Sequence, residues 1–434
     1  EGDYCGTPFR TLPARIKPLI KIGNEHYASD PNFIRDSSYR AIQRAISYRK
    51  PEYREEWNRR QKELTESAFT KIFSGYFGGC DFFRDVYYPL SDGNWAEVDN
   101  VIVADDVLIC IEVKAGVGAM QSPTQNLQSH IRTIENLVVK GYRQCDRFLN
   151  YLHSQDKVEL FEKNDTGGYR VIAKLQTKKY RKIFPLSLTV ESFSPFSAMA
   201  KNLPEIKPIC EKYHFISLSI DDLFVMRRIL KSLGELLHYF DVRQSISAIN
   251  QASLYDEIDH LGGYISNNRF DQTISNLIEE HDADFVALDR FDQDVIAPYF
   301  SNDEWPDGDV PEQDYPAELK QILSALDRTR SPGWLNADTR LRNMGGGGRN
   351  SFAENFKRLL PALKSKPTTW SSTGEESPIV IWLCRNEDMS SHGAATNRAE
   401  IVSLALNNDD ISLIQIGINS FSNIVWARAS NVNR

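Results

Sequence analysis

The sequence is poor in cysteine and has no long apolar run. Its six cysteines are scattered and form no Cys-x-x-Cys pair, which argues against a zinc ribbon or a disulfide framework and fits a reduced cytosol. The longest apolar runs, at 107–113 and 378–384, are about as long as a β-strand, whereas a membrane span needs about 20 apolar residues. The first residues show no basic-then-apolar signal pattern. We therefore expect a cytoplasmic protein without a membrane span.

Several catalytic motifs are also missing. The eight histidines show neither His-x-His nor His-Glu-x-x-His spacing, which argues against a zinc protease or a histidine-metal nuclease. No Gly-x-Ser-x-Gly nucleophile elbow occurs. The four-glycine run at 345–348 lacks the Lys and the hydroxyl residue of a P-loop. We expect this run to be a flexible connection.

The net charge of −8 is unusual for a protein that binds nucleic acid, but the charge is unevenly distributed. Residues 282–327 hold 13 Asp and Glu against 2 Lys and Arg, which more than accounts for the total. Residues 132–182 hold 12 basic against 6 acidic residues, and residues 1–65 hold 13 against 9. The first half is therefore mildly basic and could lie along a phosphate backbone. Charge alone equally fits ordinary solvated faces.

Hydrophobic periodicity predicts an α/β domain over residues 51–265, which follows an irregular basic extension over residues 1–50. The length of 434 residues is enough for two or three domains. Within the α/β domain, a hairpin is expected between 156 and 182, and helical segments run from about 222 to 265. The main predicted elements are helices over 52–77 and 124–153 and strands at 82–90, 98–103, 107–113, 183–190 and 215–220.

Each long helix has a predicted buried stripe. In the first helix the stripe is Tyr53, Trp57, Leu64, Ala68 and Ile72, widened by Phe69, Phe73 and Tyr76. In the second it is Leu127, Ile131, Ile134, Val138, Cys145, Phe148 and Leu152. Gly141 interrupts the second helix at a cost of about 1 kcal/mol, so two helices are also possible there.

The C-terminal half has no chemistry of its own in the sequence. Residues 266–330 indicate a helical and acidic linker region, and the Pro- and Asp-rich part reads as a solvated loop. The hydrophobic pattern of residues 331–434 predicts a small α/β domain, with strands at 379–384 and 411–418 and a helix near 397–406. Two such strands are too short a sheet to be stable alone. We expect them to pack on another surface and to form a docking or regulatory module for a partner or another copy of the chain.

The most informative segment is 94–116. Glu97 and Asp99 are two residues apart on one strand and share a face, as do Glu112 and Lys114 on the next strand. A hairpin closed at Asp105 and Asp106 would bring Asp99 close to Glu112. Two carboxylates in an apolar hairpin need a compensating charge. Mg²⁺ is a suitable partner because it prefers oxygen ligands, and the Val113 carbonyl could supply a third oxygen.

These residues and their order resemble the PD-(D/E)XK nuclease superfamily, and within it the Mrr-like and nuclease-related-domain (NERD) branch. The match consists of Asp99, then Glu112-Val113-Lys114 thirteen residues on, with Val98 in place of the proline. The family order of helix, three strands, helix and strand also matches, over about residues 52–220. The resemblance implies a restriction-endonuclease-like core, that is, a mixed central sheet flanked by helices. It further implies that Asp99, Glu112 and Val113 bind Mg²⁺ or Mn²⁺.

Phosphodiester chemistry suggests a role for each residue. A metal held by Asp99 and Glu112 would activate water and neutralise charge on phosphorus. Lys114 would orient the water or stabilise the transition state. The alternative is a surface hairpin with an ordinary ion pair between Glu112 and Lys114.

The resemblance also implies auxiliary residues on the two flanking helices. Glu66 is the candidate glutamate on the first helix, with Glu63 as competitor. Gln144 is the candidate glutamine on the second, because it neighbours core positions, with Gln125 and Gln128 as competitors. Each of these side chains could also be an ordinary polar group on a helix surface.

We expect a Mg²⁺-dependent endonuclease that acts on nucleic acid, DNA rather than RNA, in prokaryotic defence or restriction. The alternative is a nuclease fold that binds nucleic acid or a protein partner without cutting. A homo-oligomer or a partner from a defence system fits either function. The expected phosphate contacts lie on the second long helix: Arg132, Lys140, Arg143 and Arg147.

Overall fold

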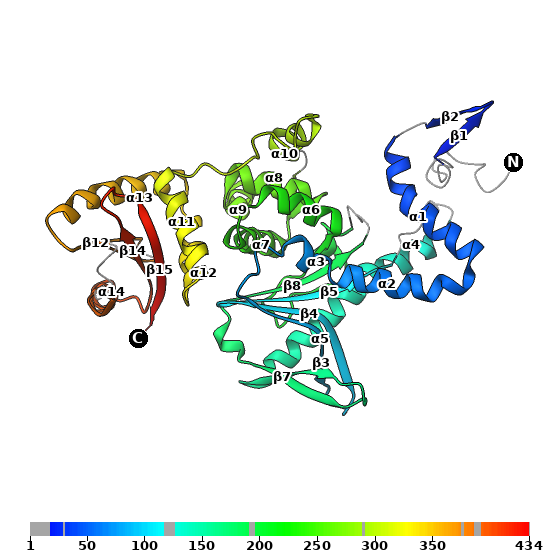
Figure 1. Cartoon of the computed structure of the whole chain (residues 1–434), viewed down its shortest axis with the longest axis horizontal. Coiled ribbons are helices and arrows are strands. Elements are labelled where there is room, and N and C mark those ends of the chain that lie inside the picture. The colour runs from blue at the N-terminus through cyan, green and yellow to red at the C-terminus, as the bar shows by residue number, and fades with distance from the viewer. Residues whose placement is uncertain are drawn as a thin grey trace.

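A mixed seven-stranded sheet forms the centre of the molecule (Figure 1). The computed structural model describes residues 18–28, 31–116, 126–190, 196–288, 291–374, 377–385 and 392–433. The strand order is β7-β6-β3-β4-β5-β8-β9. Antiparallel pairs join β7 through β5, whereas β5, β8 and β9 are parallel. The strands are β3 (Asp81–Pro89), β4 (Trp95–Ala104), β5 (Val107–Lys114), β6 (Val158–Lys163), β7 (Tyr169–Leu175), β8 (Lys182–Thr189) and β9 (Ile216–Ser219). The predicted α/β class, its strands and its 156–182 hairpin are confirmed.

Alternating side chains divide this sheet between two cores. Val101, Leu108 and Cys110 face a core that includes α5 (Lys140–His153). Ile102 and Ile109 face the opposite core. This core includes α3 (Ala68–Ile72) and the four helices that come after β9 in the chain. These helices are α6 (Ile220–Ile229), α7 (Leu233–Ala248), α8 (Glu257–Asn267) and α9 (Phe270–His281). Both sheet faces are therefore covered by helices.

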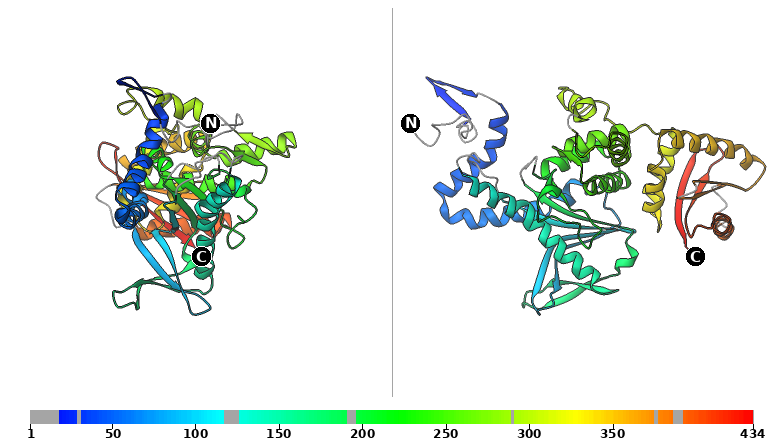
Figure 2. Two further views of the ribbon diagram at one scale, coloured as in Figure 1. Left: turned by 90° about the vertical axis from the view of Figure 1, so that its right-hand side faces the viewer. Right: turned by 180° about the vertical axis from the view of Figure 1, so that it is seen from behind.

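The N-terminal elements extend away from the sheet, at the opposite end of the molecule from the C-terminus (Figures 1 and 2). They are β1 (Leu19–Ile22), β2 (Glu25–Ala28), α1 (Pro31–Arg49) and α2 (Arg54–Glu66). The prediction that residues 1–50 are irregular is thus wrong for the hairpin and the helix. The predicted helix over 52–77 breaks at Ser67, whose hydroxyl donates to the Leu64 carbonyl at 3.0 Å. Such side-chain bonds compete with helical ones.

The second predicted helix is continuous but changes register in its middle. α4 (Leu127–Ile134) passes through a π-helical turn, Glu135–Val139, into α5. A π-turn adds a residue per turn and rotates the following face. Val138, Cys145, Phe148 and Leu152 are buried as predicted, whereas Leu127 and Ile131 are exposed. Leu64 on α2 is exposed as well, because α2 and α4 reach beyond the sheet (Figure 1).

The C-terminal module, residues 317–433, has its own four-stranded sheet in the order β12-β13-β14-β15. α14 contacts both β13 and β14, and α12 contacts β14, so the two predicted strands do pack on helices. Gly346 to Gly348 begin α13, which corrects the expected flexible connection. The elements are α11 (Ala317–Thr329), α12 (Trp334–Arg342), α13 (Gly346–Leu359), β12 (Thr368–Thr373), β13 (Ile379–Arg385), α14 (His392–Leu406), β14 (Asp410–Ile418) and β15 (Ile424–Asn433).

The acidic region before this module is only partly a loop. It includes α10 (Phe291–Ser301), while residues 302–316 form no helix or strand, as predicted. A short parallel pair, β10 (Ala252–Leu254) and β11 (Val286–Leu288), lies before it. Tyr315 is buried and belongs to the core that the sheet and the C-terminal module share. Among the described residues, no helix is long and apolar enough to cross a lipid bilayer.

Asp105, in the β4–β5 turn, attaches the central sheet to the C-terminal module. Its two carboxylate oxygens accept the backbone N–H groups of Gly333 at 2.9 Å and Leu335 at 3.1 Å. They thereby satisfy amides at the start of α12, where helix N–H groups lack partners. Asp105 also has a φ of 51°, which Asp and Asn adopt more easily than other side chains.

We predict that Asp105→Ala lowers the free energy of unfolding by about 1–3 kcal/mol, through the lost cap and the strained turn. Urea unfolding of the full chain measures this loss. Asp105→Asn is the matched control, because it keeps one acceptor oxygen and tolerates the turn, and it should lose less than half as much. Equal stability of all three proteins would contradict this role of Asp105.

Candidate functional site

The candidate site lies where β4 separates from β5. The two strands pair from Ala104 with Val107 to Asn100 with Ile111. At the next position the Asp99 carboxylate, through Oδ2, accepts the N–H of Val113 at 2.7 Å. A side chain thus takes a backbone amide of β5 that β4 no longer reaches. β5 itself continues along β8, where Glu112 pairs with Ser187.

Glu112 and Lys114 form an ion pair beside Asp99. Glu112 is 0% exposed, Asp99 is 8% exposed, and the Lys114 side chain is 10% exposed. Lys114 Nζ lies 2.9 Å from Glu112 Oε2 and donates to the Val113 carbonyl at 3.2 Å. Glu112 Oε1 is buried without a hydrogen-bond partner among the described residues. The hairpin therefore does bring Asp99, Glu112 and Lys114 together.

Burial changes the protonation of Glu112. It raises the pKa of the carboxyl to about 8, Lys114 opposes this shift, and Asp99 adds to it. Without an additional positive charge, the Glu112 carboxyl therefore ionises less readily than an ordinary glutamate. An unpartnered buried oxygen on a carboxyl group that resists ionisation marks a place where a cation would be stabilised.

An open cavity of about 550 Å³ gives access to these groups. Its lining includes Asp99 and Lys114 from the strands, Lys62 from α2, and Lys140 and Gln144 from α5. Gln61 fixes α2 at the end of β5, because its Nε2 donates to the Ala115 carbonyl at 3.1 Å. The cavity is therefore formed by the end of the hairpin and by both flanking helices.

Gly141 explains the close approach of α5 to the site. A Cβ atom at this position would lie 2.4 Å from Ser187 Oγ and 3.7 Å from Lys114 Cε. Glycine destabilises a helix interior, but at this position it allows α5 to pack closely against β8 beside Lys114.

The structure places the two auxiliary candidates near the site. The Glu66 side chain is 16% exposed, and its Oε1 lies 3.1 Å from Lys62 Nζ. Burial raises its pKa, and the charges of Asp99 and Asp85 act in the same direction. Its competitor Glu63 is exposed and pairs with Arg59.

Gln144 lines the cavity, and its Oε1 is buried without a hydrogen-bond partner in the described part of the chain. Of its competitors, Gln128 is exposed on α4, and Gln125 lies outside the described residues.

The four predicted phosphate contacts are all exposed but differ in their surroundings. Lys140 lines the cavity, and no carboxylate of the described residues forms an ion pair with it. Arg143 pairs with Glu135, and Arg147 donates to the Tyr88 hydroxyl at 3.3 Å. Arg132 is on α4 and does not line the cavity. The set is therefore not one continuous row of free charges at the site.

Two charged residues that line the cavity, Glu97 and Lys62, were not among the predicted site residues. Glu97 is two residues before Asp99 on the same face of β4 and accepts the Tyr87 hydroxyl at 3.1 Å. Its period-two spacing was a usable signal. Lys62 had no comparable signal, because its position depends on how α2 packs against β5.

The set of metal ligands is small. Within the described ranges, no cluster of three or more His, Cys, Asp or Glu side chains that could hold a metal ion is present. Asp99, Glu112 and the Val113 carbonyl are the predicted oxygen ligands, and Mg²⁺ commonly uses only one or two protein carboxylates with water completing its shell.

No known protein family, curated protein or solved structure matches the chain. A function must therefore be argued from the site itself.

The raised pKa of Glu112 predicts a pH-dependent stability. The folded state binds this proton more tightly than the unfolded state, whose carboxyl titrates near 4.5. The stabilisation of the folded state by this proton is fully present below the unfolded pKa of 4.5. It is lost as the pH rises to the folded pKa of about 8. The loss is at most about 1.4 kcal/mol per pH unit. Urea unfolding from pH 4.5 to 8.5 without divalent metal should show this decline, and Glu112→Gln should flatten it. Equal slopes in both proteins would contradict the assignment.

Proposed function

We propose that the chain is a metal-dependent nuclease that hydrolyses phosphodiester bonds, with its active site at Asp99, Glu112 and Lys114. One observation carries the proposal. Asp99 and Lys114, on adjacent strands, line an open cavity, and Lys114 pairs there with the fully buried carboxylate of Glu112. Buried charges of this kind are unfavourable for stability alone, so their presence in a cavity favours a chemical role.

The residues fit a hard divalent cation such as Mg²⁺ or Mn²⁺. Asp99, Glu112 and the Val113 carbonyl would hold it, and the orphaned Glu112 Oε1 would gain a partner. When bound, the ion would supply positive charge and acidify a water molecule. Loss of the Glu112 proton would accompany binding because the free carboxyl has a raised pKa.

Lys114 and Gln144 would act on the reacting groups. The Lys114 ammonium is oriented by Glu112 and Val113, and it can donate to a water molecule or to a phosphate oxygen in the cavity. Gln144 would orient water through its amide oxygen, which has no hydrogen-bond partner among the described residues. Glu66 acts on the site through its charge, in a positioning role.

The charge around the cavity favours a polyanionic substrate. Lys140, which forms no ion pair with the described residues, and Lys62, which pairs with Glu66, line it from two sides, and a phosphate backbone attracts such groups whatever the base sequence. The cavity itself does not distinguish DNA from RNA, so both belong in the assay.

We predict that Lys114→Ala lowers the rate of nucleic-acid cleavage by at least about 100-fold, because it removes the group nearest to the attacking water. Plasmid, linear and single-stranded DNA and RNA, each with Mg²⁺, Mn²⁺ or EDTA, form the substrate panel. Glu63→Gln is the control, an exposed helix acid that should retain full activity. Full activity of Lys114→Ala, or of the wild type in EDTA, would contradict the proposal. Binding without cleavage in every arm would favour the non-cleaving alternative.

Metal binding is tested separately from cleavage. Mg²⁺ or Mn²⁺ should raise the melting temperature of the wild type and of Lys114→Ala, because ligands that bind only the folded state stabilise it. Asp99→Asn should lose most of this shift, because it removes a charged ligand. An undiminished shift in Asp99→Asn would place the metal elsewhere.

Nucleic-acid affinity should fall steeply with salt. Lys140→Ala should reduce the slope of log K against log salt for duplex DNA by about 0.9, the loss of one phosphate contact. Arg143→Ala is the matched control on the same helix and should change the slope less, because Glu135 already neutralises Arg143. Fluorescence anisotropy in EDTA measures both. A flat salt response of the wild type would contradict phosphate binding at this surface.

A further inference from the structure

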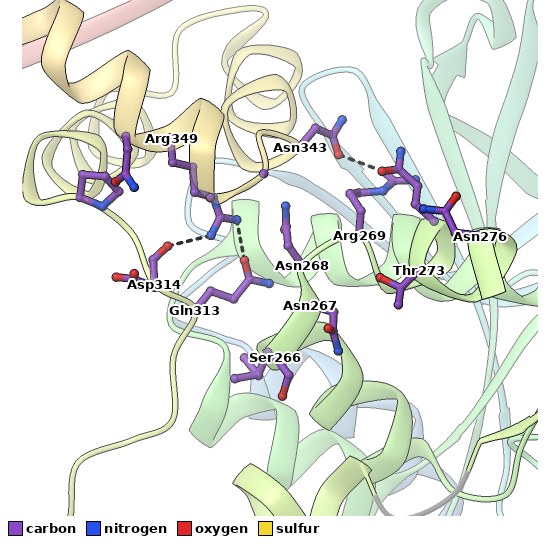
Figure 3. A pocket seen from close by; sticks show the side chains of 16 residues that line it. Ser266, Asn267, Asn268, Arg269, Thr273, Asn276, Gln313, Asp314, Asn343 and Arg349 are labelled. Carbon is purple, nitrogen blue, oxygen red and sulfur yellow. Dashed lines mark hydrogen bonds between the residues drawn. The ribbon is translucent and has the colours of Figure 1, made fainter. Parts of the chain in front are cut away.

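A second cavity, of about 370 Å³, lies between the α8–α9 junction, the segment before α11 and the start of α13 (Figure 3). It shares no lining residue with the candidate nuclease site. Asn268 and Arg269 enter it from one side, Gln313 from another, and Gly345, Gly346 and Arg349 from the third. Its volume is within the usual range of small-molecule sites.

The glycine run at this cavity is not required by the fold. Gly346, Gly347 and Gly348 form the first turn of the 14-residue helix α13, although glycine is among the least favourable helix residues. None of them, nor Gly345, has a positive φ. A Cβ atom at Gly345, Gly346 or Gly347 would meet nothing within 4 Å. The run therefore leaves open space in front of a helix N-terminus.

The amides of this first turn are available to a ligand. The N-cap residue is Gly345, which has no side chain to accept a hydrogen bond from the first N–H groups of α13. These N–H groups have no partner inside the helix. They carry partial positive charge and bind anions, phosphate groups among them.

Arg349 provides a second and independent indication of an anion. It is 4% exposed, yet no carboxylate among the described residues pairs with it. Its donors go to neutral oxygens, namely the Asp314 carbonyl at 2.8 Å, Gln313 Oε1 at 2.7 Å and the Arg342 carbonyl at 3.2 Å. Its Nε is buried without a partner in the described part of the chain. The Tyr315 ring, whose centroid lies 3.7 Å from the guanidinium carbon, offsets part of the cost of burying this cation. A buried cation without a counter-ion is still unfavourable, and the cavity beside Arg349 could hold an anion.

The nearby Arg269 does not play this role. Its guanidinium pairs with Asp271 and with Asp241, and it donates to Asn343 Oδ1 at 2.9 Å. The positive charge left for a ligand is thus that of Arg349 and of the α13 amides.

The remaining wall of the cavity is rich in side-chain amides. Asn268 donates through Nδ2 to the Arg342 carbonyl at 2.8 Å, while its Oδ1 is buried without a partner in the described residues. Amides offer a donor and an acceptor side by side, which suits the edge of a nucleobase or the hydroxyls of a sugar. The other amide side chains of the lining are Asn267, Gln272, Asn276, Gln313, Asn343 and Asn350.

We propose that this cavity binds a nucleoside phosphate. The phosphate would lie on the first turn of α13 beside Arg349, and the base or sugar would face the amides around Asn268. The site joins the helices behind the central sheet to the C-terminal module, so a ligand would bridge these two parts of the chain.

Gly346→Glu separates ligand binding from folding. An acidic residue in a first turn suits the helix dipole, and the space at Gly346 is open, so the variant should fold at least as stably. Its carboxylate would repel a phosphate from the same turn. Gly393→Glu is the matched control, also an open glycine at the beginning of a helix, α14, and away from the cavity.

The measurement is isothermal titration of the full-length chain, in EDTA, with ATP, GTP, CTP and UTP, the matching nucleosides and inorganic phosphate. We expect at least one nucleotide to bind, and its nucleoside and inorganic phosphate to bind at least about tenfold more weakly. Gly346→Glu should weaken nucleotide binding by about tenfold or more, whereas Gly393→Glu and Lys114→Ala should not.

Three results with the nucleotides, phosphate and Gly346→Glu would overturn the proposal, and so would a fourth with Lys114→Ala. The first three are no binding of any of the four nucleotides, undiminished binding by Gly346→Glu, or binding of inorganic phosphate as tight as that of the best nucleotide. Loss of binding in Lys114→Ala would place the nucleotide in the nuclease cavity and would overturn it as well. None of these results depends on nuclease activity.

Discussion

The Glu112 carboxylate is the constraint on which the candidate site depends. It is fully buried in a largely apolar sheet, where a lone charge is unfavourable. Lys114 returns to the same face two residues later and supplies part of the missing charge. Asp99 takes the Val113 amide where β4 leaves β5 and so stabilises the open end of the hairpin. These three side chains lie together where the backbone pairing of β4 with β5 ends.

The β4–β5 hairpin also connects this opening to the rest of the chain. Its closed end, through Asp105, caps the start of α12 in the C-terminal module. Its open end carries Asp99 and Glu112. The α13 helix that borders the second cavity follows α12 directly in the same module. Both cavities are thus attached to one continuous framework, because one face of the sheet shares a hydrophobic core with the C-terminal module.

Local patterns were sufficient to predict the sheet and the central part of the site. Period-two alternation located β3, β4 and β5 to within a few residues, and the spacing of Asp99, Glu112 and Lys114 predicted their meeting across a hairpin. Features that depend on packing were missed. The π-helical turn before Lys140, the helical start of the glycine run and the approach of Lys62 to the cavity arise from contacts between distant segments. Gly141 shows the same limit, because its helical cost is explained only by Ser187 and Lys114 opposite it.

The most direct test of the central claim is a crystal structure of the protein with Mn²⁺, whose anomalous scattering identifies the ion. The account predicts one manganese peak within about 2.0–2.6 Å of oxygens from Asp99, Glu112 and the Val113 carbonyl, with Lys114 Nζ turned toward the water-filled cavity. An unchanged Lys114–Glu112 ion pair with no manganese at these oxygens, at a concentration that supports cleavage, would contradict it.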